Sequence, residues 1–219
     1  MEANITAVWW GLLASTALIA VVHAAAGPDH YLPFIAIGMA RKWSRTKAFA
    51  VVLVSGIAHV LSSVAIGVVG IAAGIGLESL KFLEGTRGTV AGWLLIFAGA
   101  LYLAWSLRPR HHHAHAEDIA NDPRAQRRGI IFWVFVAVIV LGPCEPLIPL
   151  MFVAVQISWA AVAAASLLFL ILTLAMMELF VLTGLAGISL LPKRLTHHLG
   201  NAFAGLVIIG LGIALMLFA

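Results

Sequence analysis

Long apolar runs constrain this chain of 219 residues more than any other feature of its sequence. A bilayer core about 30 Å thick needs roughly 20 apolar residues per helix, and several runs here are that long. Hydrophobic residues make up 63% of the chain and charged residues only 10%, whereas an ordinary soluble domain has roughly 25% charged residues. A soluble fold could not bury so much apolar surface, so an all-α integral membrane protein is expected.

Hydropathy predicts six transmembrane helices. They cover Ala7 to Ala26, Ala48 to Gly74, Thr89 to Leu107, Gly129 to Val155, Ser158 to Leu182 and Asn201 to Phe218. The first run is expected to stay as a span, because Met1 to Thr6 lacks the basic flank of a secretory signal. The first and fourth runs continue past Gly27-Pro28 and Gly142-Pro143. Proline removes a backbone donor and kinks a helix, so both are predicted to be broken or re-entrant helices.

Basic residues gather in alternate loops of this predicted topology. The loops after spans one, three and five carry Arg41, Lys42, Arg45, Lys47, Arg108, Arg110, Arg124, Arg127, Arg128, Lys193 and Arg194. The other two loops carry only Lys81 and Arg87. By the positive-inside rule the basic loops are cytoplasmic and both termini lie on the outer side of the cell (inner) membrane. The lipid bilayer is the expected partner, nucleic acid is not, and a homo-oligomer is compatible with the sequence.

The two halves of the chain share a sequence pattern. The Gly-Pro pair repeats at an offset of 115 (142 − 27), in Gly27-Pro28-Asp29-His30 and Gly142-Pro143-Cys144-Glu145. A second match has an offset of 113 (204 − 91), between Ala91-Gly92, Ile96 and Gly99 and the residues Ala204-Gly205, Ile209 and Gly212. Because three spans on each side of a loop start from opposite faces, these matches predict a 3+3 inverted repeat. Its parts are residues 1–107, a His-rich cytoplasmic loop at 108–128, and residues 129–219, with the helix glycines as packing surfaces.

Ionisable residues lie within the predicted spans and at their breaks. Burying a charge at bilayer depth disfavours insertion by roughly 2.5 to 3.5 kcal/mol or more, so such residues are functional by default. Imidazole and carboxylate suit nickel, cobalt or zinc, and a thiolate would bias the site toward softer ions. The predicted metal-site residues are His23, Asp29, His30, His59, Cys144, Glu145 and Glu178. The metal ion is the expected transported substrate, and no tightly bound cofactor is expected.

Each of these residues also has a plainer interpretation. The histidines and acids could serve as caps or interhelical hydrogen-bonding groups, and Cys144 could be a small buried hydrophobe that forms no disulfide, since the chain has one cysteine. Glu178 could be a ligand, a proton-coupling carboxylate or a partner of His59. The tract His111-His112-His113-Ala114-His115 could concentrate metal at a cytoplasmic mouth or be a solvated linker.

The segment from His23 to His30 resembles the first-helix signature of the nickel/cobalt transporter (NicO) superfamily, especially its UreH-type membrane proteins. The segment Gly56 to Ser63 is similar to its Gly-His element, and Gly142 to Pro146 to its Pro-Cys-Glu element. The resemblance covers most of the chain. It implies a metal permease or exporter in which His23, Asp29, His30 and His59 help select the ion.

Two departures from that pattern bear on nickel selectivity more than on metal transport. The nickel/cobalt permeases usually carry a four-residue spacer where this chain has the five residues between His23 and Asp29. Their second-helix histidine is commonly followed by Ser, where this chain has Val60.

The expected function is therefore transport of a divalent transition-metal cation, nickel or cobalt first, with no enzymatic reaction. One alternative is a thiol-disulfide reductant carrier, because the Gly-Pro-Cys element is also similar to that of cytochrome-biogenesis thiol carriers; it needs a second cysteine. Another is export of a small metabolite, which for an anion predicts cationic residues at membrane depth. None lies inside the predicted spans. The identity of the ion, the direction and the energy source stay open.

Overall fold

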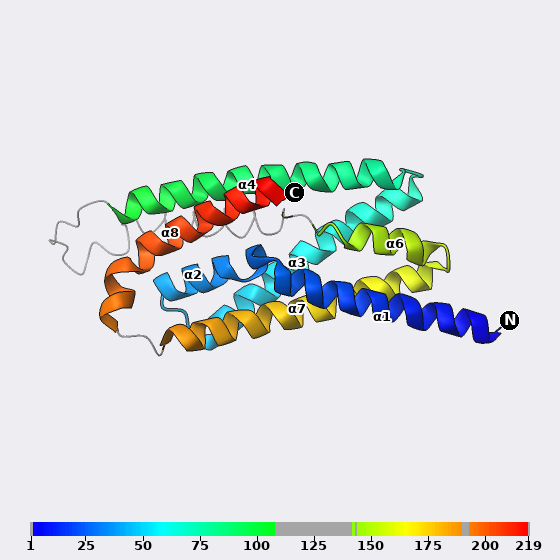
Figure 1. Cartoon of the computed structure of the whole chain (residues 1–219), viewed down its shortest axis with the longest axis horizontal. Coiled ribbons are helices and arrows are strands. Elements are labelled where there is room, and N and C mark those ends of the chain that lie inside the picture. Colours follow the sequence, from blue (N-terminus) through cyan, green and yellow to red (C-terminus); the bar gives the residue numbers. More distant parts are fainter. Residues whose placement is uncertain (1, 108–141, 143, 190–192, 219) are drawn as a thin grey trace, which may run out of the picture.

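The computed structural model describes residues 2–107, 142, 144–189 and 193–218, and this part of the chain contains helices and no strand. The first half has α1 (Glu2–Ala26), the single 3-10 turn η1 (Pro28–His30), α2 (Leu32–Ala40), α3 (Arg45–Ala72) and α4 (Leu77–Ser106). The second half has α6 (Leu147–Val155), α7 (Trp159–Ser189) and α8 (Lys193–Phe218). In Figure 1, α4 and α8 run along one side of the molecule, α1 and α7 along the other, and α2, α3 and α6 lie between them.

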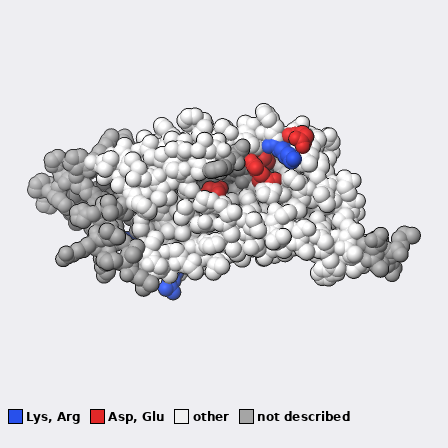
Figure 2. All heavy atoms as spheres, viewed as in Figure 1, with Lys and Arg blue, Asp and Glu red and all other residues white. Residues whose placement is uncertain are grey.

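Several of these helices are long and apolar enough to cross a membrane. By length and composition the described residues contain 4 such stretches: Thr6–Ala26, Arg45–Ala72, Leu77–Ala104 and Trp159–Ile188. The apolar stretch Ala202–Leu217 of α8 is shorter. Large apolar side chains lie on the outside, and most of the face in Figure 2 carries neither acidic nor basic groups. Soluble monomers rarely expose such surfaces, so the helices indicate a multi-pass membrane protein.

The observed helices differ from the predicted spans mainly at the third. Helix α4 begins at Leu77, twelve residues (89 − 77) before the predicted start of that span. The predicted topology places this segment in a loop that carries Lys81 and Arg87. In the structure Glu84 and Arg87 pair with each other on α4, so neither is an uncompensated charge there. Residues 108–141, with the His-rich loop and the first part of the fourth predicted span (129–141), lie outside the described residues.

The break that the sequence predicts after the first span is present. Helix α1 ends at Ala26, and Gly27 takes an extended conformation (φ −86°, ψ 92°) because it precedes proline. A single turn follows, in which the N–H of His30 donates to the carbonyl of Gly27 at 3.1 Å. Helix α2 then starts with proline in its first turn, where the missing N–H costs nothing.

The short helices α2 and α6 match in length and position. Each has 9 residues, and both ends of α6 follow those of α2 at an offset of 115 (147 − 32 and 155 − 40). This is the offset at which the Gly-Pro pair repeats. Each short helix also contacts the long helix of the other half, α2 against α7 and α6 against α3.

Helices α4 and α8 approach closely over glycines. A Cβ added to Gly92 would lie 3.0 Å from the carbonyl oxygen of Gly212, and one added to Gly99 would lie 3.0 Å from that of Gly205. In the reverse direction, a Cβ on Gly212 would lie 2.7 Å from the carbonyl oxygen of Gly92. The expectation that these four glycines form packing surfaces is confirmed.

Candidate metal site

Three histidines from three separate elements meet inside the bundle. His23 comes from the last turn of α1, His30 ends η1, and His59 lies in the middle of α3. The ring centroids of His23 and His30 are 4.5 Å apart, and those of His30 and His59 are 5.1 Å apart. His30 and His59 are both buried. The ring of His30 therefore packs against both of the other rings.

Gly27 lets the chain bring His30 back toward His23. A Cβ at this position would lie 2.6 Å from Nδ1 of His30 and 3.0 Å from the carbonyl oxygen of His23. Any larger residue would therefore collide with the imidazole. The Gly-Pro break is thus both the end of α1 and the space that the second histidine occupies.

Cys144 brings a thiol from the second half of the chain. It is fully buried, and its Sγ lies 3.7 Å from Nε2 of His23. One ligand atom each of His23, His59 and Cys144 lies within 4.8 Å of the other two. Two imidazoles and a thiol are a donor set that binds transition metals.

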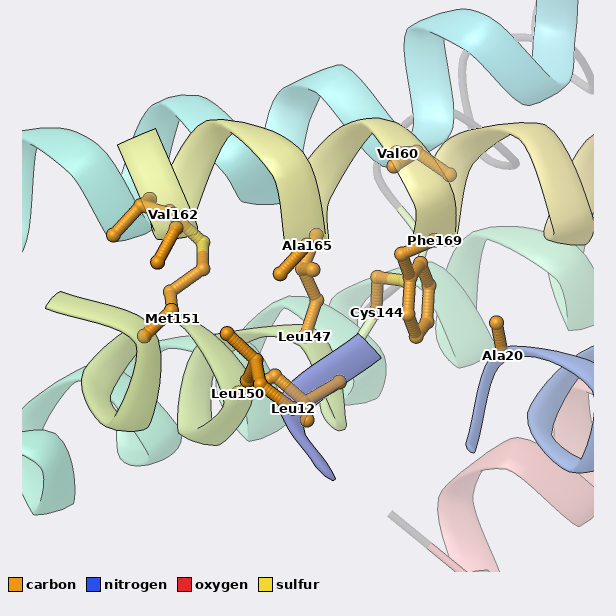
Figure 3. Close-up of a cluster of buried hydrophobic side chains, with 12 residues drawn as sticks. Leu12, Ala20, Val60, Cys144, Leu147, Leu150, Met151, Val162, Ala165 and Phe169 are labelled. Atoms are coloured by element: carbon orange, nitrogen blue, oxygen red, sulfur yellow. The ribbon is translucent and has the colours of Figure 1, made fainter. Parts of the chain in front are cut away.

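Apolar side chains also pack around Cys144. Figure 3 shows it beside Phe169 in a cluster of buried side chains that also includes Leu147 and Val60. The ring of Phe169 also lies 5.9 Å from that of His23, centroid to centroid. These side chains exclude water from one side of the donor set, and a low dielectric strengthens electrostatic interactions there.

Asp29 lies beside the donor set and contacts His30. Its Oδ1 is 3.3 Å from Nδ1 of His30. A carboxylate at one ring nitrogen fixes the orientation of an imidazole and raises its basicity as a ligand. The other nitrogen, Nε2, is buried and has no hydrogen-bond partner within the described part of the chain. His30 is therefore oriented on one side and has an unused nitrogen on the other.

Two cavities adjoin these residues. One of about 520 Å³ is lined by His23, Asp29, His30 and the exposed Glu145, together with apolar side chains. The other, of about 20 Å³, lies between Asp29, His30 and His59, which is room for about one water molecule. Asp29 and His30 line both cavities and so lie between the larger space and His59.

Glu178 is the predicted site residue that no described contact links to the histidines. It lies on α7, next to Met177, which lines the small cavity. Both carboxylate oxygens of Glu178 are buried and lack a hydrogen-bond partner among the described residues. No described contact supports the prediction that Glu178 is a metal ligand.

Sequence reasoning missed a buried charge pair beside the site. Glu84 on α4 is fully buried, accepts a hydrogen bond from the backbone N–H of Cys144 at 3.0 Å, and pairs with Arg87. Arg87 donates to the hydroxyl of Ser62 at 2.7 Å. The sequence does contain a signal for this pair, which is the i,i+3 spacing of the opposite charges Glu84 and Arg87. That spacing places both on one helix face, and using it would have extended the predicted third span toward its N-terminus.

Comparison with protein-family models, with curated proteins and with solved structures finds no match to this chain in any of the three. A functional assignment therefore rests on the residues and distances described above.

Proposed function

We propose that this protein is a membrane transporter that moves a divalent transition-metal cation through a site formed by His23, His59 and Cys144. The observation that carries the proposal is that donor atoms of these residues, from α1, α3 and the segment before α6, lie within 4.8 Å of one another. Nickel and cobalt are the first candidates because of the resemblance to the NicO superfamily. Zinc also suits two imidazoles and a thiolate.

The proposal includes a six-span 3+3 inverted repeat. Under the offset of 113, Gly92 corresponds to Gly205 and Gly99 to Gly212, yet the close approaches join Gly92 to Gly212 and Gly99 to Gly205. A two-fold axis between α4 and α8 produces this crosswise pattern. Gly92 then contacts the equivalent of Gly99, and Gly99 contacts the equivalent of Gly92. The crossed contacts of α2 with α7 and of α6 with α3 support the same symmetry.

An inverted repeat accounts for the position of the site. In transporters of this kind, substrate sites lie where the discontinuous helices of the two halves meet near the middle of the membrane. Here the first break supplies His30 and Asp29 and the second supplies Cys144. The proposed path leads from the cavity lined by Glu145 and Asp29, whose carboxylates attract cations, to the buried imidazoles.

Two alternatives have less support. A thiol-disulfide carrier needs two cysteines, and the whole chain has only Cys144. An anion exporter needs a cationic residue at membrane depth. The sequence predicted none inside the spans, but Arg87 lies in the candidate span Leu77–Ala104, so that prediction is wrong. The guanidinium of Arg87 is paired with Glu84, so the charge is already balanced.

Metal uptake by the full-length protein in proteoliposomes tests the proposal. Nickel, cobalt and zinc would be added outside, and a metal-sensitive dye inside would report entry. We expect His23→Ala and His59→Ala to slow uptake at least about 10- to 100-fold, the loss typical of changing even an outer-shell partner of a metal ligand. Leu61→Ala, exposed on the same helix as His59, is the matched control and should transport normally. Undiminished uptake by both histidine variants, or by an Asp29→Ala, His30→Ala double variant, would overturn the proposal.

A further inference from the structure

Glu84 holds the backbone of Cys144 in place from another helix. Cys144 lies just ahead of α6, and N–H groups at the start of a helix have no partner within that helix. The N–H of Cys144 instead donates to the Glu84 carboxylate at 3.0 Å. The carbonyl of Cys144 accepts the N–H of Leu147 at 3.1 Å, where α6 begins. Both peptide groups of Cys144 are therefore fixed, and with them the direction of its thiol.

The Glu84 carboxylate has partners on several sides. The hydroxyl of Ser63 donates to it at 3.2 Å, and Arg87 forms an ion pair with it one turn further along α4. A buried carboxylate is tolerated when it is both paired and hydrogen-bonded, and Glu84 is both. Its charge is thus balanced without a metal ion, which distinguishes it from the acids that line the cavities.

The same network reaches the segment that carries His59. Arg87 donates to the hydroxyls of Ser62 at 2.7 Å and Ser63 at 3.3 Å. The hydroxyl of Ser62 in turn donates to the carbonyl oxygen of His59 at 2.7 Å. One charge pair on α4 therefore contacts the two segments that carry His59 and Cys144.

We propose that Glu84, with its charge balanced by Arg87, is the positioning residue that holds the Cys144 thiol toward His23 and His59. The inference rests on the proposed function where it treats the thiol as a metal ligand. Without an acceptor at position 84, the buried N–H of Cys144 lacks a partner, and the peptide turns to find another. That rotation moves the thiol away from the imidazoles, while the three histidines keep their places.

A matched pair of double variants separates the hydrogen bond from the charge. Glu84→Gln, Arg87→Met and Glu84→Met, Arg87→Met are both neutral and similar in volume, and only the first keeps an oxygen acceptor at position 84. Two readouts apply to the full chain in detergent. Alkylation reports on one thiol, because Cys144 is the chain's single cysteine. Cobalt(II), added as the probe metal, gives a charge-transfer absorbance only where a thiolate binds it.

We expect the Met double variant to be alkylated about tenfold faster than wild type. The buried backbone N–H of Cys144 has then lost its hydrogen-bond partner, so the residue holds its thiol in the buried position less firmly. We expect this variant to bind cobalt about 10- to 100-fold more weakly and without the charge-transfer band. The Gln double variant also lacks Arg87 but keeps the oxygen acceptor, so it should be alkylated more slowly than the Met double variant and keep the charge-transfer band. Equal alkylation rates and an unchanged band in the two double variants would overturn the inference.

The remaining outcomes distinguish this inference from the proposed function. If wild type binds cobalt without a charge-transfer band, Cys144 is not a ligand, and this overturns its part in the proposed site. If wild type binds no metal, the proposed function fails. The alkylation rates of the matched pair then still decide whether Glu84 positions the thiol.

Discussion

The backbone N–H of Cys144 donates to the carboxylate of Glu84 at 3.0 Å, although 60 residues separate them in the chain. This hydrogen bond joins α4 to the segment that precedes α6. The thiol of Cys144 also lies 3.7 Å from Nε2 of His23, 121 residues away. The candidate site therefore depends on how the two halves pack, and variants that disturb this packing should affect metal binding without changing a ligand.

Gly27→Ala should weaken metal binding by about tenfold. The added Cβ would lie 2.6 Å from Nδ1 of His30 and 3.0 Å from Oδ1 of Asp29, and crowding of this kind costs about 1 to 3 kcal/mol. Titration calorimetry with nickel and cobalt would measure the affinity. Gly11→Ala is the control, because nothing lies within 4 Å of a Cβ at that position of α1. Equal affinity in the two variants would show that His30 does not need the space at Gly27.

Gly212→Ala should lower the free energy of unfolding by about 1 to 3 kcal/mol. Its Cβ would lie 2.7 Å from the carbonyl oxygen of Gly92 and 2.9 Å from the backbone nitrogen of Ile96. Backbone atoms cannot rotate away as a side chain can, so α4 and α8 must separate. Thermal unfolding in detergent would measure the loss. Gly210→Ala lies on the same helix with nothing within 4 Å, and a melting temperature as low as that of Gly212→Ala would argue against a close helix contact.

The membrane class and the first helix break were predictable because they depend on local properties of the sequence. The length of an apolar run sets whether a helix can span the bilayer, and Pro28 ends α1 whatever surrounds it. The start of α4 was not predictable in this way. Arg87 counted as a loop charge, and its pairing with Glu84 on one helix face, which makes the segment compatible with a membrane, appears only in the structure.

The candidate site was predictable as a set of residue types and not as an arrangement. Buried imidazoles and acids stand out in an apolar sequence, but their distances depend on the packing of helices far apart in the chain. The structure brings His23, His59 and Cys144 together, and places His30 and Asp29 beside them. Sequence reasoning gave Glu84 no role, since it falls within the predicted loop between the second and third spans.

Cys144→Ser should change which metal the protein prefers. A hydroxyl is a harder and weaker ligand than a thiolate, so affinity should fall more for zinc than for nickel, and we expect the ratio of the two affinities to shift about tenfold. Competition between the two metals for purified protein would measure this ratio. An unchanged ratio would indicate that Cys144 is only a small buried hydrophobe beside Phe169.

Asp29→Ala should weaken metal binding about 10- to 100-fold, because the carboxylate 3.3 Å from Nδ1 of His30 orients that imidazole. Asp29→Asn keeps an oxygen that can accept from the ring, so its loss should be smaller. Glu78→Ala removes the same charge from an exposed position at the start of α4 and should leave the affinity unchanged. If the Asp29 and Glu78 variants lost affinity equally, Asp29 would act through net charge alone. If Asp29→Asn lost as much as Asp29→Ala, the negative charge itself would be what the ion requires, and Asp29 would be better placed as a ligand than as a support for His30.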